Sequence, residues 1–187
     1  MFRTRAAVSC AALALSLGAT SATLAPAAFA SAGHPHAAPA GNGKFTTWAK
    51  AQTAAGFNLK KPTVLHGLTR TGKIRVSTCE VTGSTTKRDV SATYGKLSTG
   101  LLTLDQNNSG HPCGDVGDAR LLATPKIDGV KAQLFGACGM SGEPSCSSKR
   151  TFLFLIWKKG KISFVAQSHQ ETRSAIISFG RSLKPVG

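Results

Sequence analysis

The sequence predicts an α+β fold: a mostly antiparallel sheet of about six or seven strands, with a short N-terminal helix and a C-terminal amphipathic helix packed on one face. Segments that alternate apolar and polar residues recur from residue 74 onward, which is the pattern of half-buried strands. Short turns separate many of them, and strands joined by hairpins run antiparallel. The last segment instead repeats its apolar residues at helical spacing.

Residues 1–30 have the pattern of a secretory signal peptide. Arg3 and Arg5 precede a short apolar stretch, and small residues around Ala30 form a cleavage site. Cleavage after Ala40 is the alternative. The protein is therefore expected to be secreted and extracellular.

The remaining chain divides into a lead-in and one domain. Residues 31–43 are small and polar, which predicts a flexible segment. Residues 44–187 are expected to form a single disulfide-stabilised α+β domain. No later segment approaches the ~20 apolar residues of a membrane span, so we expect no transmembrane segment in the mature chain.

The first element of the domain is a short helix. Thr46 or Thr47 can cap it, Trp48 and Ala51 begin its apolar spacing, and Gly56 can end it. Strands are then predicted over 74–79, 90–94, 101–104, 121–123, 130–134, 151–157 and 162–166. The last two are the most apolar, and we expect them to form a hairpin near the centre of the sheet.

The predicted C-terminal helix follows this hairpin. Ser168 and Glu171 have the spacing of a capping box, in which each side chain satisfies a backbone amide of the first turn. Its expected apolar stripe consists of Ile176, Ile177, Phe179 and Leu183, and Pro185 should stop it.

Four cysteines remain after the signal peptide, which in an exported chain indicates two disulfides with three possible connectivities. We favour a local bridge that closes a Gly/Ser/Pro loop and a second, longer one. No zinc-type spacing is present, and we expect no metal and no cofactor. The favoured pairs are Cys138–Cys146 and Cys79–Cys113.

Residues 90–183 resemble an extracytoplasmic domain of unknown function found in bacterial envelope and anti-sigma-type proteins. The resemblance is carried by the strand 90–94, the Leu-x-Leu-x-Gln of 102–106, the Trp-Lys-Lys-Gly turn that begins at Trp157, and the terminal helix. It implies an antiparallel sheet with a closing helix, a sensing or binding role, and no catalytic residues.

The motifs of common enzyme classes are missing from the sequence. There is no Gly-x-Ser-x-Gly elbow and no phosphate-binding glycine loop. We interpret Asp105, Asp115 and Asp118 as turn residues. One alternative is a secreted nuclease-like enzyme that uses a base, an acid and a phosphate-binding cation, namely His169, Glu171 and Arg173. Another is an inhibitor of exported proteases that presents the 138–146 loop.

The strongest remaining signal is the formal charge of +15. If the basic turns gather at one end of the sheet, they form a positive rim that attracts polyanions. We therefore predict a secreted, non-enzymatic binding module at the bacterial cell envelope that contacts an anionic cell-wall polymer, or another polyanion, through a basic face. Solubility alone is the competing interpretation. The candidate contact residues are Lys87, Arg88, Lys149, Arg150, Lys158, Lys159 and Lys161.

Overall fold

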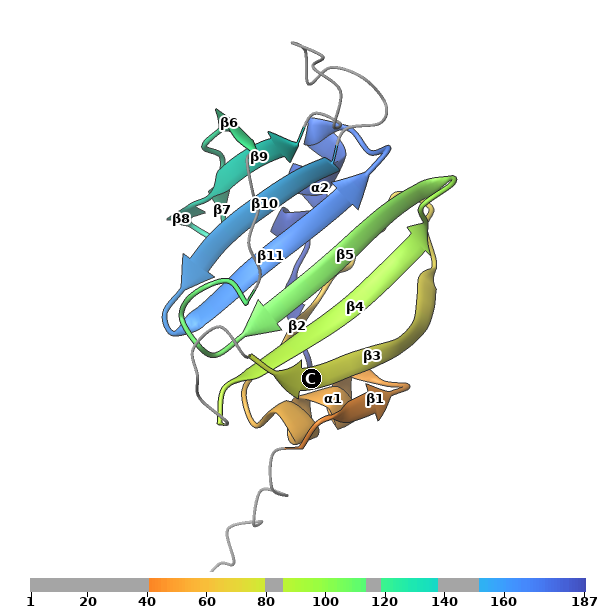
Figure 1. Cartoon of the computed structure of the whole chain (residues 1–187), viewed down its shortest axis with the longest axis vertical. Coiled ribbons are helices and arrows are strands. Elements are labelled where there is room, and N and C mark those ends of the chain that lie inside the picture. Colours follow the sequence, from red (N-terminus) through yellow and green to blue (C-terminus); the bar gives the residue numbers. More distant parts are fainter. Residues whose placement is uncertain (1–40, 80–85, 114–118, 138–151) are drawn as a thin grey trace, which may run out of the picture. The chain divides into compact units, whose positions relative to one another are not determined.

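An eight-stranded antiparallel sheet organises the protein in this computed structural model (Figure 1). The structure describes residues 41–79, 86–113, 119–137 and 152–187. In sheet order the strands are β1 (Gly43–Phe45), β3 (Arg70–Thr78), β4 (Arg88–Lys96), β5 (Gly100–Asn107), β11 (Ile162–His169), β10 (Phe152–Lys159), β9 (Gln133–Ala137) and β6 (Arg120–Ala123).

Besides the large sheet, the described residues form two short two-stranded ribbons and two helices. β2 (Lys60–Lys61) pairs with β12 (Lys184–Pro185), and β7 (Lys126–Ile127) pairs with β8 (Val130–Lys131). The helices are α1 (Trp48–Ala55) and α2 (Arg173–Arg181). None of the helices in the described ranges is long and apolar enough to cross a membrane. The predicted α+β class is confirmed, whereas the expected six or seven strands in the sheet are too few.

The core lies between one face of the sheet and the two helices. Alternate strand residues, such as Leu102, Leu104, Leu153 and Leu155, point to this face and are almost fully buried. α1 packs on β1 and β3, and α2 packs on β10 and β11 (Figure 1). The intervening strand residues point to the opposite face of the sheet, on which neither of the two described helices packs. We call this opposite side the open face.

Helix α1 forms as the sequence predicts. The hydroxyl of Thr47 accepts a hydrogen bond from the backbone amide of Lys50 at 3.3 Å, and Gly56 ends the helix in the left-handed conformation at φ 73°. Ala51 and Ala55 are buried against the sheet. The small side chains let the helix lie close to β3.

Helix α2 begins later than predicted, and the expected capping box is absent. Ser168 is a buried residue of β11, because its strand continues to His169 and pairs with β5 and β10 on both sides. The helix is capped instead by Thr172, whose hydroxyl accepts from the amide of Ala175 at 3.1 Å. Glu171 precedes the helix. Sheet pairing on two sides outweighed the local capping preference.

Two other boundaries also differ from prediction. The single strand predicted over 130–134 is split at Ala132 into β8 and β9, and the amide of Ala132 donates to the carbonyl of Pro125 at 2.8 Å. The expected lead-in 31–43 extends too far, since Gly43 is already part of β1. The predicted hairpin is confirmed, and its strands β10 and β11 lie inside the sheet.

Replacing Gly95 by alanine should destabilise the fold strongly. Gly95 has φ 76°, and a Cβ atom there would overlap the carbonyl oxygen of Gly100 on β5. Gly160 also has positive φ, 61°, but a Cβ there meets nothing within 4 Å. We expect Gly95→Ala to cost about 3 kcal/mol and Gly160→Ala about 1 kcal/mol in urea unfolding. Equal losses would show that the close approach of β4 and β5 does not matter.

Candidate functional site

The open face of the sheet is divided into a polar half and an apolar half. One row of directly paired residues runs across this face from β3 through β4, β5, β11 and β10 to β9. In that order, its side chains are a cation, a hydroxyl, a carboxyl, two apolar groups and an amide. The change from polar to apolar falls between β5 and β11. The row consists of Arg75, Ser91, Asp105, Val165, Ile156 and Gln133.

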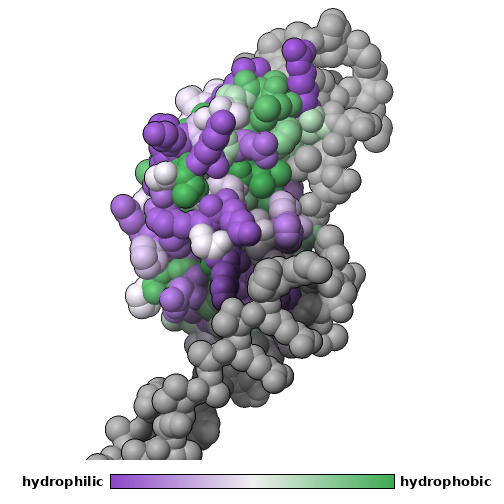
Figure 2. Space-filling model, turned by 90° about the vertical axis from the view of Figure 1, so that its left-hand side faces the viewer, coloured by the Kyte–Doolittle hydropathy of each residue, from purple (hydrophilic) through white to green (hydrophobic). Residues whose placement is uncertain are grey.

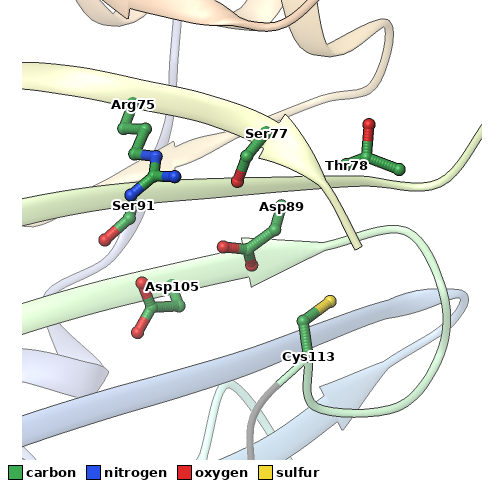
Figure 3. A pocket seen from close by; sticks show the side chains of 7 residues that line it. All are labelled: Arg75, Ser77, Thr78, Asp89, Ser91, Asp105 and Cys113. Carbon is green, nitrogen blue, oxygen red and sulfur yellow. The ribbon is translucent and has the colours of Figure 1, made fainter. Parts of the chain in front are cut away.

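A hollow of about 340 Å³ lies on the polar half (Figure 3). We call it the carboxyl hollow, because Asp89 on β4 and Asp105 on the neighbouring β5 lie side by side in its wall. Arg75 on β3 extends its guanidinium toward Ser91. The lining is completed by Ser77, Thr78 and Cys113.

Both carboxyl groups are held in surroundings that favour the protonated form. Burial raises the pKa of Asp89 to about 7, and the nearby Asp105 raises it further while Arg75 lowers it. Burial likewise raises the pKa of Asp105 to about 6, against the opposing effect of a hydrogen bond with Ser91. The Oδ1 atom of Asp89 is buried without a hydrogen-bond partner. No cation among the described residues forms an ion pair with either carboxyl group.

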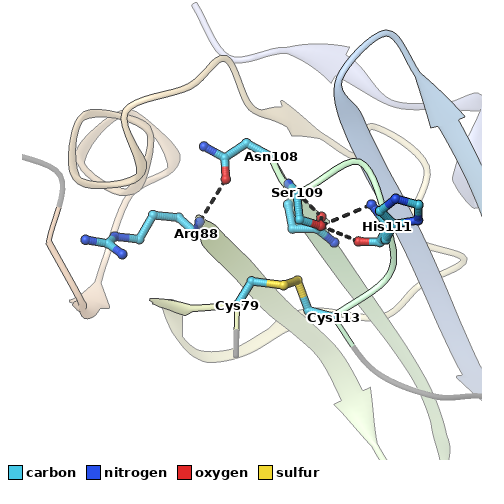
Figure 4. Close-up of a disulfide and its surroundings, with 7 residues drawn as sticks. Cys79, Arg88, Asn108, Ser109, His111 and Cys113 are labelled. Carbon is cyan, nitrogen blue, oxygen red and sulfur yellow. Dashed lines mark hydrogen bonds between the residues drawn. A yellow bond between two sulfur atoms is a disulfide. The ribbon is translucent and has the colours of Figure 1, made fainter. Parts of the chain in front are cut away.

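A disulfide-anchored loop lies between the carboxyl hollow and a second hollow. The bridge joins Cys79, after β3, to Cys113, as predicted (Figure 4). Within the loop, the amide of His111 donates to the hydroxyl of Ser109 at 3.1 Å. Cys113 lines the carboxyl hollow, whereas Gly110 and Pro112 of the same loop line the second one.

The second hollow has a volume of about 520 Å³ and belongs to the apolar half of the open face. Its walls come from the loop, from β6 and from the ends of β8 to β11. Two lysines, Lys131 and Lys158, stand among apolar side chains. The apolar lining is Pro112, Leu121, Ile156 and Trp157.

Basic residues occur on both short ribbons, around the β10–β11 turn and at the end of α2, elements that Asp128 and Arg181 connect. Figure 2 faces the side of the molecule where β7 and β8 lie, and hydrophilic residues form a broad band there between hydrophobic patches. We call this group the basic corner; all its members except the half-buried Lys60 are exposed. It consists of Lys60, Lys61, Lys126, Lys131, Lys158, Lys159, Lys161, Arg181 and Lys184.

Asp128, in the turn between β7 and β8, forms ion pairs with two lysines of the basic corner. Its carboxylate pairs with Lys60 of β2 and, at 2.8 Å, with Lys159 of β10. Burial alone would raise the pKa of Asp128, but the hydrogen bonds and charges of these two lysines hold it below its ordinary value. The side chain of Arg181 adds a hydrogen bond to the carbonyl of Lys126 at 3.2 Å. One carboxylate thus stands among many cations.

Two pairs of lysines in the basic corner face each other directly. Lys61 is opposite Lys184 in the β2–β12 ribbon, and Lys126 is opposite Lys131 in the β7–β8 ribbon. Like charges in directly opposed positions of an antiparallel pair destabilise it, by roughly 0.2–1 kcal/mol for each pair. The fold therefore tolerates repulsion at this corner.

The predicted basic residues are only partly brought together. Lys158, Lys159 and Lys161 belong to the basic corner, whereas Lys87 and Arg88 lie at the β3–β4 turn. There the backbone amide of Arg88 donates to Asn108 at 2.8 Å, beside the disulfide (Figure 4). Several other predicted features lie outside the described residues: Lys149, Arg150, Cys138, Cys146, the 138–146 loop and the 1–30 signal peptide.

His169, Glu171 and Arg173 are not joined to one another in the described part of the chain. The Nδ1 atom of His169 lies 3.2 Å from the carbonyl oxygen of Leu97, and its ring packs on Phe152 with centroids 4.4 Å apart. Arg173 is exposed at the start of α2. Neither of the two hollows includes any of the three.

The local sequence pattern does not predict the carboxyl hollow. Asp105 is not the turn residue that we expected, because it lies inside β5, opposite Ser91 of β4. The strand period was the available signal, since it places Asp89, Ser91 and Asp105 on the face opposite the apolar residues. In the described ranges, no group of three or more acidic, histidine or cysteine side chains is arranged to hold a metal ion.

Comparison with known proteins gives no relative: no family model matches the chain, and neither any curated protein nor any solved structure does. The resemblance of residues 90–183 to an extracytoplasmic domain therefore stays a prediction.

Proposed function

We propose that the protein is a secreted, non-enzymatic module that binds an anionic cell-wall polymer through the basic corner. The observation that carries the proposal is the direct opposition of like charges, Lys61 with Lys184 and Lys126 with Lys131. A surface needed only for solubility would gain from interspersed acidic residues, which lower self-repulsion. A chain of negative groups laid across the corner would supply that compensation from outside.

A polymer that is recognised by its charge fits the basic corner better than a nucleic acid that is recognised by its bases. Single-stranded nucleic acids are usually bound with exposed aromatic side chains on which the bases stack. Trp157, the aromatic residue beside Lys158, is only 3% exposed and stacks on Phe164 with ring centroids 5.0 Å apart. It is therefore part of the core and offers no stacking surface.

The Cys79–Cys113 disulfide supports placement of this activity outside the cytoplasm. Disulfides persist mainly in oxidising compartments. Together with the signal-peptide pattern of residues 1–30, it fits a protein that meets the polymers of the bacterial envelope after export.

Removing four charges from the basic corner should weaken polymer binding. The test variant carries glutamine at Lys61, Lys126, Lys161 and Lys184, and retention on immobilised teichoic acid is measured across a salt series. At about 0.5 kcal/mol for each exposed contact, the affinity at low salt should fall about 30-fold. Added salt should weaken wild-type binding, because exposed charges are screened.

The matched control removes four exposed charges elsewhere: Lys50, Lys73, Lys96 and Arg173 to glutamine. Both variants have the same net charge, so the control should bind nearly as tightly as the wild type. Equal weakening of both variants would show that binding depends on the net charge of the protein and not on the basic corner. Tighter binding to single-stranded RNA than to teichoic acid would overturn the choice of polymer.

A further inference from the structure

We propose that the apolar half of the open face binds a fatty acid, with the carboxylate at Lys131 and Lys158 and the chain along β10. The site has a hollow for the head group and an apolar track for the chain. It uses two lysines of the basic corner but does not require that the corner bind a polymer.

The head-group end is the hollow of about 520 Å³. Lys131 from β8 and Lys158 from β10 both line it, and both are exposed and form no ion pair in the described part of the chain. Among the described residues, the carboxylate that forms ion pairs near this hollow is that of Asp128, and it binds Lys60 and Lys159 instead. Two uncompensated ammonium groups beside apolar walls fit a single anionic head on an apolar body.

The track consists of side chains that alternate with the core residues of β10. Ile156 lies in the hollow, and Phe154 and Phe152 follow it toward the other end of the strand. At about 3.3 Å per residue, the four-residue step from Ile156 to Phe152 spans roughly 13 Å. These side chains are absent from the core between sheet and helices, so they belong to the open face.

Neighbouring strands widen the track into an apolar surface. Phe135 of β9 lies directly opposite Phe154, and Leu121 of β6 lies opposite Phe135. Leu121 is 47% exposed and Phe152 is 39% exposed. Contiguous apolar surface of this kind is a mark of a binding site in a folded protein. The lysines at one end select an anionic ligand over a neutral or cationic one.

Dodecanoate, kept below its micelle concentration, is the probe that tests the inference. Isothermal titration with the full mature chain should show saturable binding with one ligand per protein. Dodecyl maltoside has the same chain with a neutral head, and dodecylamine has a cationic head; both should bind at least tenfold more weakly. Octanoate should also bind more weakly, because its chain covers less of the track.

Variants separate the two ends of the site. Lys131→Gln/Lys158→Gln should weaken dodecanoate binding at least tenfold and leave dodecyl maltoside unaffected, while Phe154→Ser should weaken both. Lys50→Gln/Lys96→Gln and Val64→Ser, which alter exposed residues that line neither the hollow nor the track, are the matched controls and should bind as the wild type does. Absence of dodecanoate binding, or equal binding of the three dodecyl compounds, would overturn the proposal. Loss of teichoic acid binding alone would not.

Discussion

The Asp89→Asn variant is expected to be more stable than the wild type at pH 8 and equally stable near pH 3. The pKa of Asp89 is raised to about 7 in the folded protein, first by burial and then by Asp105. The unfolded chain, with an ordinary pKa near 3.8, releases its proton earlier. Wild-type stability should therefore fall as the pH rises from about 4 to 7, because the folded state binds more protons than the unfolded state.

The magnitude follows from the same pKa difference. A rise from 3.8 to about 7 corresponds to roughly 4 kcal/mol at most, and relaxation around the hollow reduces it, so we expect a gain of about 2–4 kcal/mol for Asp89→Asn at pH 8. Urea unfolding at several pH values measures it. The asparagine amide can also donate a hydrogen bond toward Asp105, which the carboxylate cannot.

Asp128→Asn is the matched control with the opposite sign. The pKa of Asp128 is lowered in the folded state, so its ionised form contributes stability that is present above its ordinary pKa and lost as the pH falls. Its replacement should slightly destabilise the protein at pH 8. An advantage of Asp89→Asn that stays constant from pH 4 to pH 8 would show that the carboxyl hollow does not perturb its acids.

Removing the Cys79–Cys113 bridge should cost about 4 kcal/mol of folding free energy. The bridge closes a loop with a sequence separation of 34 residues, and the chain-entropy relation for a loop of that length gives this value. Alanine at both positions is the suitable change, because Cys79 is 1% exposed and a serine there would bury an additional hydroxyl. Thermal unfolding of the double variant against the wild type measures the loss.

A second measurement tests the pairing itself. A non-reducing peptide map of the wild type should join the fragments that contain Cys79 and Cys113. A map that joins either cysteine to Cys138 or Cys146 would contradict the bridge, and a double variant as stable as the wild type would contradict its contribution.

Local sequence patterns predicted an element correctly where no long-range strand pairing competes with them. Helix α1 has its cap at Thr47 and its stop at Gly56, both readable within ten residues. The predicted start of α2 was wrong because the capping preference of Ser168 competes with sheet pairing on both sides of β11. A local pattern does not show pairing partners that lie far along the chain.

The candidate sites were harder to predict because they depend on register. Asp89 and Asp105 become neighbours only after β4 and β5 pair in one specific alignment. The opposed lysines of β2 and β12 are separated by most of the domain and meet only in the folded chain. Charge composition predicted that cations would dominate the surface, but not which of them would gather.

The loop that ends at Cys113 supplies wall residues to both hollows. Its covalent tie to Cys79 anchors this wall to the end of β3, so that oxidation of the two sulfur atoms fixes a boundary of both hollows at once. With the two thiols reduced, the wall that both hollows share would lose its covalent anchor.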